Sequence, residues 1–149
     1  MKLDKQTTID VRDRCLCLHV QRAARRLARR FDDALRPFGL TNGQFSLMMS
    51  LNRPEPPRLG EVADFLAMDR TTLTAAIKPL ERQGLIHSRP DPDDRRARRL
   101  SLTDDGHALL IEAAKVWRVE HDALDAEIGG DPARLRHELL TISRGPSGQ

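Results

Sequence analysis

The chain has 149 residues, of which 39% are hydrophobic and 32% charged. This composition supplies one modest hydrophobic core, and no run approaches the ~20 apolar residues that a membrane-spanning helix needs. The polar segment 1–10 has no apolar signal region, so we expect a cytoplasmic protein without membrane contact. The net charge of +3 at pH 7 is a mild bias that by itself identifies no partner.

A long helical pattern comes first. Residues 8–36 contain neither Pro nor Gly, and their apolar side chains recur at steps of three and four, which predicts one continuous helix. Pro37 and Gly39 end the pattern. The basic run from Arg22 to Arg30 is interpreted as a solvated face of this helix. The apolar stripe consists of Val11, Cys15, Leu18, Leu27, Phe31 and Leu35.

Three shorter helices are predicted next. The first spans 41–51 and begins at Thr41, a residue type that caps helix N-termini well. A connection stiffened by prolines leads to a short amphipathic helix over 59–66. The third helix spans 70–83, with Asp69 as its N-cap.

The period then changes from helical to extended. Gly84 is expected to close the preceding helix in a left-handed conformation, and Pro79 is expected to kink or weaken it. Residues 85–89 and 97–102 look extended, and the turn cluster 91–94 lies between them. Together they predict a β-hairpin.

The last third of the chain is predicted to be helical. Thr103 caps a long helix that Gly129 and Gly130 break, and a final helix covers about 131–143. A frayed tail is expected over 145–147.

The two helices that meet across residues 67–69 form a predicted helix-turn-helix. Short hydroxyl side chains allow a helix to approach base edges and thymine methyl groups, and Arg and Lys contact phosphates. The same threonines also occur as ordinary helix caps, so this pair alone does not establish DNA binding. The side chains presented by the second helix are Arg70, Thr71, Thr72, Thr74, Ala75 and Lys78.

The predicted hairpin strengthens the DNA-binding interpretation. Between Lys78 and Arg99 the chain has seven basic and four acidic residues, an excess equal to its whole net charge. An arginine projected from a narrow hairpin suits the minor groove, where the potential is most negative. Asp94 lies two residues before Arg96 and is placed to hold it extended, although an exposed ion pair would contribute little. The basic residues of the hairpin are Arg95, Arg96, Arg98 and Arg99.

An ordered series of motifs resembles the MarR family of bacterial transcription regulators. The resemblance spans about Leu40 to Gly106, and the flanking helices fit the dimerisation region of that family. The most specific part is the Asp-Arg-Arg turn followed by Leu-x-Leu-Thr-x-x-Gly. The matching segments are Leu59–Ala63, Asp69–Thr74, Leu80–Ile86, Asp94–Arg96 and Leu100–Gly106.

The resemblance implies a mainly α fold with a small β-hairpin wing, a winged helix-turn-helix. It places Thr71, Thr72, Thr74 and Lys78 in the major groove, and Arg96 in the minor groove with Asp94 as its orienting partner. It also implies that residues 1–36 and 104–149 dimerise while 40–103 form the DNA-binding lobe. A homodimer presents two recognition helices about one DNA turn apart, so we expect a pseudo-palindromic operator in double-stranded DNA.

Two kinds of signal remain open for a repressor of this family. In the first, a small and often phenolic inducer binds a cleft lined by Arg25, Arg29, Phe45, Met48 and Met49, although a Met and Phe stripe is also typical of plain core. In the second, Cys17 senses peroxide, because its distance from Gln44 matches the reactive cysteine of the hydroperoxide sensors of the family. Those sensors use tyrosines to hold the thiolate, and this chain has none. Cys15 and Cys17, two apart on one helix, would point in different directions and could not easily bridge.

Other functional classes find less support in the sequence. Five scattered histidines lack a paired carboxylate or nucleophile, there is no Gly-rich phosphate loop, and no Cys/His cluster has metal-ligand spacing. We therefore predict neither an enzyme, a cofactor nor a metal site, and interpret the histidines as isolated surface residues. A winged helix that binds another protein is the remaining alternative, and the exposed hairpin arginines count against it.

Overall fold

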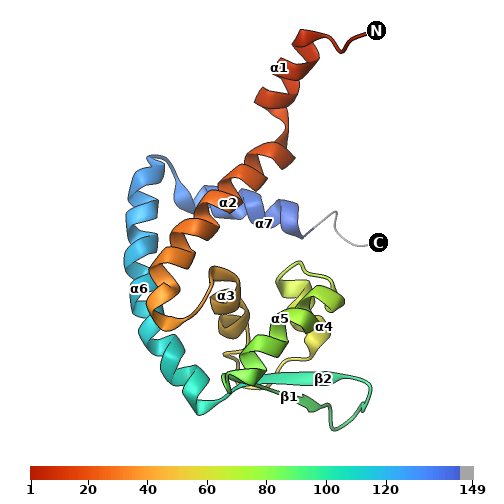
Figure 1. Cartoon of the computed structure of the whole chain (residues 1–149), viewed down its shortest axis with the longest axis vertical. Coiled ribbons are helices and arrows are strands. Elements are labelled where there is room, and N and C mark those ends of the chain that lie inside the picture. The colour runs from red at the N-terminus through yellow and green to blue at the C-terminus, as the bar shows by residue number, and fades with distance from the viewer. Residues whose placement is uncertain (145–149) are drawn as a thin grey trace.

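A computed structural model describes residues 1–144 of the chain and confirms a mainly helical fold with one small antiparallel hairpin (Figure 1). A short 3₁₀ turn, η1, covers Arg36–Phe38 between the second and third helices. The strands β1 (Ile86–Pro90) and β2 (Arg98–Leu102) pair in register from Ile86 opposite Leu102 to Pro90 opposite Arg98. The helices are α1 (Lys5–Arg14), α2 (Leu16–Leu35), α3 (Asn42–Ser50), α4 (Leu59–Phe65), α5 (Arg70–Arg82), α6 (Asp104–Ile128) and α7 (Pro132–Ser143).

The prediction of one continuous helix over 8–36 is wrong. The backbone of Cys15 is extended, with φ −72° and ψ 106°, so α1 and α2 are separate helices. None of the residues 5–14 is buried, and Val11 is 53% exposed. Most helical stability in proteins comes from packing an apolar face, and α1 packs no such face that would keep it in line with α2.

Side-chain caps begin the helices of the lobe where the sequence predicts them. Thr41 and Gln44 form a reciprocal capping box at α3. The Asp69 side chain accepts a hydrogen bond from the Thr72 amide at α5. Gly84 then closes α5 at φ +71°, as predicted, and α5 continues through Pro79 without an interruption. These local interactions fix the start of α3 and both ends of α5, the second helix of the helix-turn-helix.

The hydrophobic core lies between α2, α3, α4, α5, the hairpin and the first half of α6. Alternation along β2 turns Leu100 inward, and steps of three and four along α5 bury Leu73, Ile77 and Leu80. The opposite face of α5 therefore points away from the core. The largest fully buried side chains include Leu35, Met48, Leu73, Leu80, Ile86 and Leu100.

The hairpin is joined tightly to α6. Thr103 caps α6 by accepting from the Gly106 amide at 3.0 Å, and its hydroxyl donates to the Gly84 carbonyl at 2.7 Å. A Cβ at Gly106 would lie 2.1 Å from the Leu85 carbonyl oxygen, so only glycine permits this contact. The first turn of α6 consequently rests directly on the segment that leads into β1.

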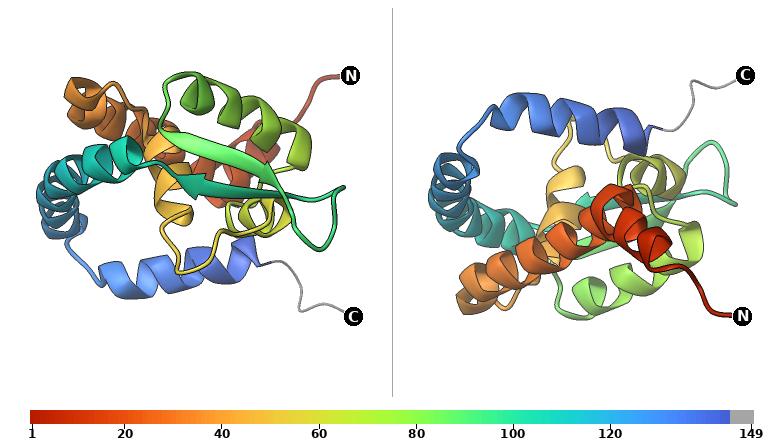
Figure 2. Two further views of the ribbon diagram at one scale, coloured as in Figure 1. Left: turned by 90° about the horizontal axis from the view of Figure 1, so that it is seen from below. Right: turned by 90° about the horizontal axis from the view of Figure 1, so that it is seen from above.

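The terminal helices differ from this lobe. None of the residues 132–143 of α7 is buried, and Figure 2 shows α7 standing apart from the hairpin and α5. Within residues 1–144, no helix is both long and apolar enough to cross a membrane. The tail expected over 145–147 lies outside the described residues. The exposed apolar side chains of α7 are Leu135, Leu139, Leu140 and Ile142.

Candidate nucleic-acid interface

The outward face of α5 carries the predicted recognition residues. Thr71, Thr72, Thr74 and Lys78 are all exposed, while Leu73 anchors the helix in the core. The Thr72 hydroxyl donates to Asp69 at 2.7 Å and the Thr74 hydroxyl donates to the Arg70 carbonyl at 2.7 Å. Each hydroxyl group donates one hydrogen bond locally and keeps its acceptor lone pairs, and both threonines are exposed. Hydroxyl and methyl groups are those with which threonine contacts bases and thymine methyls.

A groove of about 760 Å³ lies between α4, α5 and the hairpin. The Arg70 guanidinium lies across Gly60 at the start of α4, where a Cβ would come within 2.8 Å of its Nη2 atom. Acidic side chains, including Glu61 and Glu81, line part of the groove as well. Six of the predicted DNA-binding residues meet here: Arg70, Thr74, Lys78, Asp94, Arg96 and Arg98.

The arginines of the hairpin fall into different environments. Within residues 1–144, Arg95 and Arg96 are exposed at the turn and their guanidinium groups form no ion pair. Arg98 instead folds back on β1, where it donates to the hydroxyl and the carbonyl of Ser88 at 2.7 Å each. Arg95 and Arg96 therefore carry the free positive charge at the end of the hairpin.

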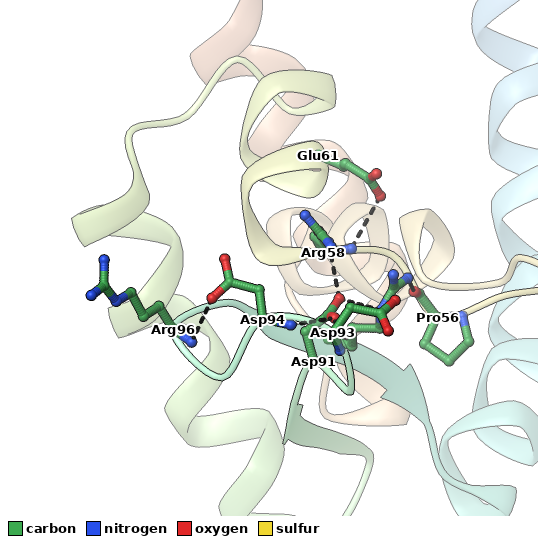
Figure 3. A network of polar contacts seen from close by, with 8 residues as sticks. Pro56, Arg58, Glu61, Asp91, Asp93, Asp94 and Arg96 are labelled. Atoms are coloured by element: carbon green, nitrogen blue, oxygen red, sulfur yellow. Dashed lines mark hydrogen bonds and ion pairs between the residues drawn. The ribbon is translucent and has the colours of Figure 1, made fainter.

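The Asp94 side chain contacts the backbone of Arg96 and not its guanidinium group. The Asp94 carboxylate accepts a hydrogen bond from the Arg96 amide at 3.0 Å, and the Arg96 side chain extends away from it (Figure 3). The prediction that Asp94 holds the side chain of Arg96 is thus replaced by an Asx-type turn that fixes the main chain. The guanidinium group is left free to reach an external acceptor.

Sequence reasoning missed the most buried polar residue of the hairpin. The sequence places Asp91 only in a turn cluster, yet its side chain has no exposed surface. One carboxylate oxygen accepts from the amides of Asp93 and Asp94, and the other accepts from Arg58 and Arg99 (Figure 3). Arg99, which the sequence analysis counts among the exposed arginines of the hairpin, is therefore turned inward.

These contacts stabilise the ionised form of Asp91. The hydrogen bond from the Asp93 amide contributes most, followed by those from Asp94, Arg99 and Arg58, and together they lower the pKa of Asp91 to about 2 against the opposing effect of burial. A buried carboxylate at this turn had no signal in the sequence, since Arg58 is 33 residues away.

The comparisons with known proteins agree with this geometry. Residues 40–97 match the MarR family. The structure is similar to the M. tuberculosis transcriptional regulator MosR in complex with DNA, with 35% identity, a TM-score of 0.80, and coverage of 87% of this chain and 94% of that one. The chain belongs to the MarR family.

Two further relatives extend the match. The transcriptional repressor CouR bound to a 23-mer DNA duplex is 30% identical, with a TM-score of 0.77 over 97% of this chain and all of that one. The organic hydroperoxide resistance transcriptional regulator of Bacillus subtilis is 29% identical over 95% of this chain and 90% of that protein. This MarR protein is accordingly a DNA-binding transcription regulator with a winged helix-turn-helix, and not an enzyme.

The residues predicted to line an inducer cleft in this MarR protein do not form a single site. Phe45 and Met49 line a cavity of about 410 Å³ between α3, α4 and α6. Arg25 and Arg29 line a separate depression of about 480 Å³ on the outer face of α2. Met48 is fully buried in the core.

An aromatic cluster adjoins the first cavity. The His121 ring lies 4.7 Å from that of Phe31 and 4.4 Å from that of Trp117, and Phe45 lies 6.1 Å from Trp117. Burial, followed by the charge of Arg136, lowers the pKa of His121. His121 is therefore not the isolated surface histidine that the sequence analysis expected. Its spacing of four residues from Trp117 on α6 is the signal that pointed to a shared face.

The two cysteines lie at the junction of α1 and α2. Cys15 is partly buried and Cys17 is exposed in the first turn of α2, and both are free thiols. Because Cys15 lies outside both helices, the argument that one continuous helix separates the two thiols does not apply. Within residues 1–144, no cluster of His, Cys, Asp and Glu has a metal-binding arrangement.

Proposed function

We propose that this regulator is a homodimeric repressor that binds a pseudo-palindromic operator and is released by a small-molecule inducer. In each subunit α5 would enter the major groove and Arg96 the adjacent minor groove. The observation that carries this proposal is the pairing of an exposed Thr and Lys face on α5 with an unpaired arginine at the end of the hairpin. Thr, Lys and Arg side chains are the groups that commonly contact base edges and phosphates.

The terminal helices support dimerisation. Exposed apolar side chains continue from α6 onto α7, where Leu135, Leu139 and Ile142 lie on one face at steps of three and four. Such a face is too apolar to be left in water and suits the same face of a second copy. We therefore assign residues 1–36 and 104–149 to dimerisation, and 40–103 to the DNA-binding lobe.

The cavity between α3, α4 and α6 is the inducer site that the geometry favours. Its lining combines Phe45, Met49 and Trp117 with the cation of Arg118, which suits an aromatic compound with an acidic group. A ligand wedged there would move α4 relative to α6, and with it the helix-turn-helix relative to the dimerisation helices. Arg25 and Arg29 take no part in this version of the proposal, because they line a different surface.

The proposal is tested by binding of the purified protein to the DNA upstream of its own gene. Wild type and Arg96→Ala are compared over a salt series, with Arg36→Ala as a control that removes the same charge from an exposed site outside the hairpin. We expect Arg96→Ala to weaken binding about tenfold and to lower the salt dependence by about one phosphate contact. A folded wild-type dimer that fails to bind duplex DNA at low salt would refute the proposed function.

Peroxide sensing by Cys17 is the second candidate. It is favoured by the exposure of Cys17 beside Cys15 and by the similarity over 95% of the chain to a hydroperoxide resistance regulator. The Cys17→Ser protein should then keep its DNA affinity and lose release by hydroperoxide. Release that is unchanged in Cys17→Ser would exclude this candidate and leave the small-molecule inducer.

A further inference from the structure

We propose that Asp91 is the positioning residue of the wing, and that its buried carboxylate sets the direction of Arg96 relative to α5. The inference rests on the proposed placement of Arg96 in the minor groove and goes beyond it, because Asp91 itself is buried and does not reach DNA. It predicts a residue on which operator affinity depends without any contact with the operator.

The two oxygens of the Asp91 carboxylate bind two different parts of the molecule. Oδ1 accepts from the amides of Asp93 at 2.8 Å and Asp94 at 3.1 Å, which lie in the turn of the hairpin. Oδ2 accepts from Nε of Arg58 at 2.9 Å and Nε of Arg99 at 2.7 Å. One carboxylate therefore links the hairpin turn to the residue that precedes α4.

The side of the lobe that receives this link is itself held by several hydrogen bonds. The Arg58 amide donates to the Glu61 side chain at 3.0 Å at the start of α4. Arg99 also donates to the Pro56 carbonyl at 2.7 Å, and the Leu100 amide donates to the Pro57 carbonyl at 3.0 Å. The segment 56–58 thus runs beside β2 as a short extended partner. It gives Asp91 a fixed anchor.

A short chain of hydrogen bonds leads from Asp91 to Arg96. The Asp91 amide donates to the Ala97 carbonyl at 2.9 Å, and the Ala97 amide donates to the Asp94 carbonyl at 2.9 Å. The Asp94 side chain then accepts from the Arg96 amide at 3.0 Å. The backbone of Arg96 is therefore set by a turn whose other end is held by Asp91, while its guanidinium extends outward (Figure 3).

Loss of the Asp91 charge would free the turn and leave the base of the hairpin in place. Asp91→Asn keeps the shape of the side chain and one oxygen for the turn amides, but its NH2 group cannot accept from Arg58 and Arg99, so the turn loses its link to segment 56–58. The base of the hairpin is held separately by Ile86 and Leu100, both buried in the core. The affected segment is the turn 91–97, which carries Arg96.

The test is a double-mutant cycle on operator affinity, with Asp91→Asn, Arg96→Ala and the double variant. Asp93→Asn is the matched control, because it removes the same charge from a neighbouring exposed side chain whose backbone amide alone binds Asp91. We expect Asp91→Asn to weaken binding about tenfold, as loss of one groove contact does. It should add little to Arg96→Ala, and it should add fully to Thr72→Ala on α5.

Amide hydrogen exchange provides a readout that does not depend on DNA. Exchange of the Asp93 and Asp94 amides should be slow in the wild type and fast in Asp91→Ala, which has no acceptor oxygen, while the amides of the β1–β2 ladder keep their protection. Arg99→Met, which removes one anchor and keeps the aliphatic stem, should show a smaller change in the same direction. It serves as the test variant if Asp91→Asn fails to fold.

Several outcomes would overturn the inference. Asp91→Asn that binds DNA like Asp93→Asn, or that is fully additive with Arg96→Ala, would show that Asp91 does not act through the wing arginine. Unchanged exchange of the Asp93 and Asp94 amides would show that the carboxylate does not hold the turn. If Arg96→Ala itself leaves affinity unchanged, the wing contact of the proposed function fails, and the exchange measurement still decides whether Asp91 holds the turn.

Discussion

The winged lobe and the terminal helices differ in how far their side chains are buried and hydrogen-bonded within one chain. In the lobe, the helices α3 and α5 begin at side-chain caps, the core side chains of α5 are buried, and a buried carboxylate holds the hairpin turn. In α1 and α7 none of the residues 5–14 and 132–143 is buried, and four large apolar side chains of α7 are exposed. The core of the lobe is buried within one chain, whereas we propose that the terminal helices cover their apolar side chains with a second copy. Substitutions in the lobe should therefore impair folding and DNA binding, whereas substitutions in the terminal helices should impair assembly.

The largest effect is expected where α6 joins the lobe. Gly106→Ala would place a methyl group 2.1 Å from the Leu85 carbonyl oxygen, a backbone atom that cannot move without displacing β1. We expect a loss of about 3 kcal/mol or more in the free energy of unfolding, measured by urea denaturation. Gly130→Ala, where a Cβ would meet no atom within 4 Å, is the control. Equal stability of the two variants would mean that α6 does not rest on the hairpin as described.

A change on α7 should affect assembly and spare the lobe. Leu139→Asp places a charge on the apolar face that we assign to the dimer, and we expect the dimer dissociation constant to rise at least about 30-fold, the size of a central interface residue. Sedimentation measures this shift, while circular dichroism reports the retained helices. His137→Asp, on the opposite face of α7, should leave the dimer intact. A Leu139→Asp protein that remains dimeric would move the interface elsewhere.

The pH dependence of stability should reveal the charge of Asp91 inside the lobe. Its pKa is about 2 in the folded protein against an ordinary value of 3.8, so the folded state binds this proton less readily than the unfolded state. The stabilising contribution is fully present above pH ~5 and is lost as the pH falls through about 4 to 2. The difference in unfolding free energy between wild type and Asp91→Asn should shrink over that interval. A difference that stays constant down to pH 2 would show that the folded state does not depress this pKa.

What could be predicted from the sequence depends on how far apart the interacting residues lie in the chain. The caps at Thr41, Asp69 and Thr103 were predictable because each side chain bonds to an amide three residues ahead. Asp91 was not, because its partner Arg58 is distant in sequence and the Asp-Pro-Asp-Asp run also reads as an ordinary exposed turn. The break at Cys15 escaped prediction because α1 lacks the packing that its apolar spacing implies.

The candidate inducer residues show the same limit. Phe45, Met48 and Met49 all lie on α3, but successive residues of a helix point about 100° apart around its axis. Met48 therefore lies in the core while Phe45 and Met49 reach the cavity beside α6. Trp117 completes that cavity from α6, more than 60 residues away in the chain, and no local pattern connects it to α3.

The smallest effect tests the junction between the two regions. His121 lies on α6 between Phe31 of α2 and Trp117, with its pKa lowered below the ordinary 6.5 by burial and then by Arg136. The unfolded chain therefore takes up this proton more readily, and stability should decline as the pH falls below about 6.5 until the folded histidine is protonated as well.

Trp117 is the only tryptophan in the sequence, and a protonated imidazole 4.4 Å from its ring quenches indole fluorescence. The fluorescence should accordingly fall with a midpoint below 6.5, a transition that His121→Gln abolishes and His107→Gln retains. An inducer bound against Phe45 and Trp117 should shift the midpoint of this transition. A midpoint that stays the same with every compound able to release DNA would show that the inducer binds outside this junction.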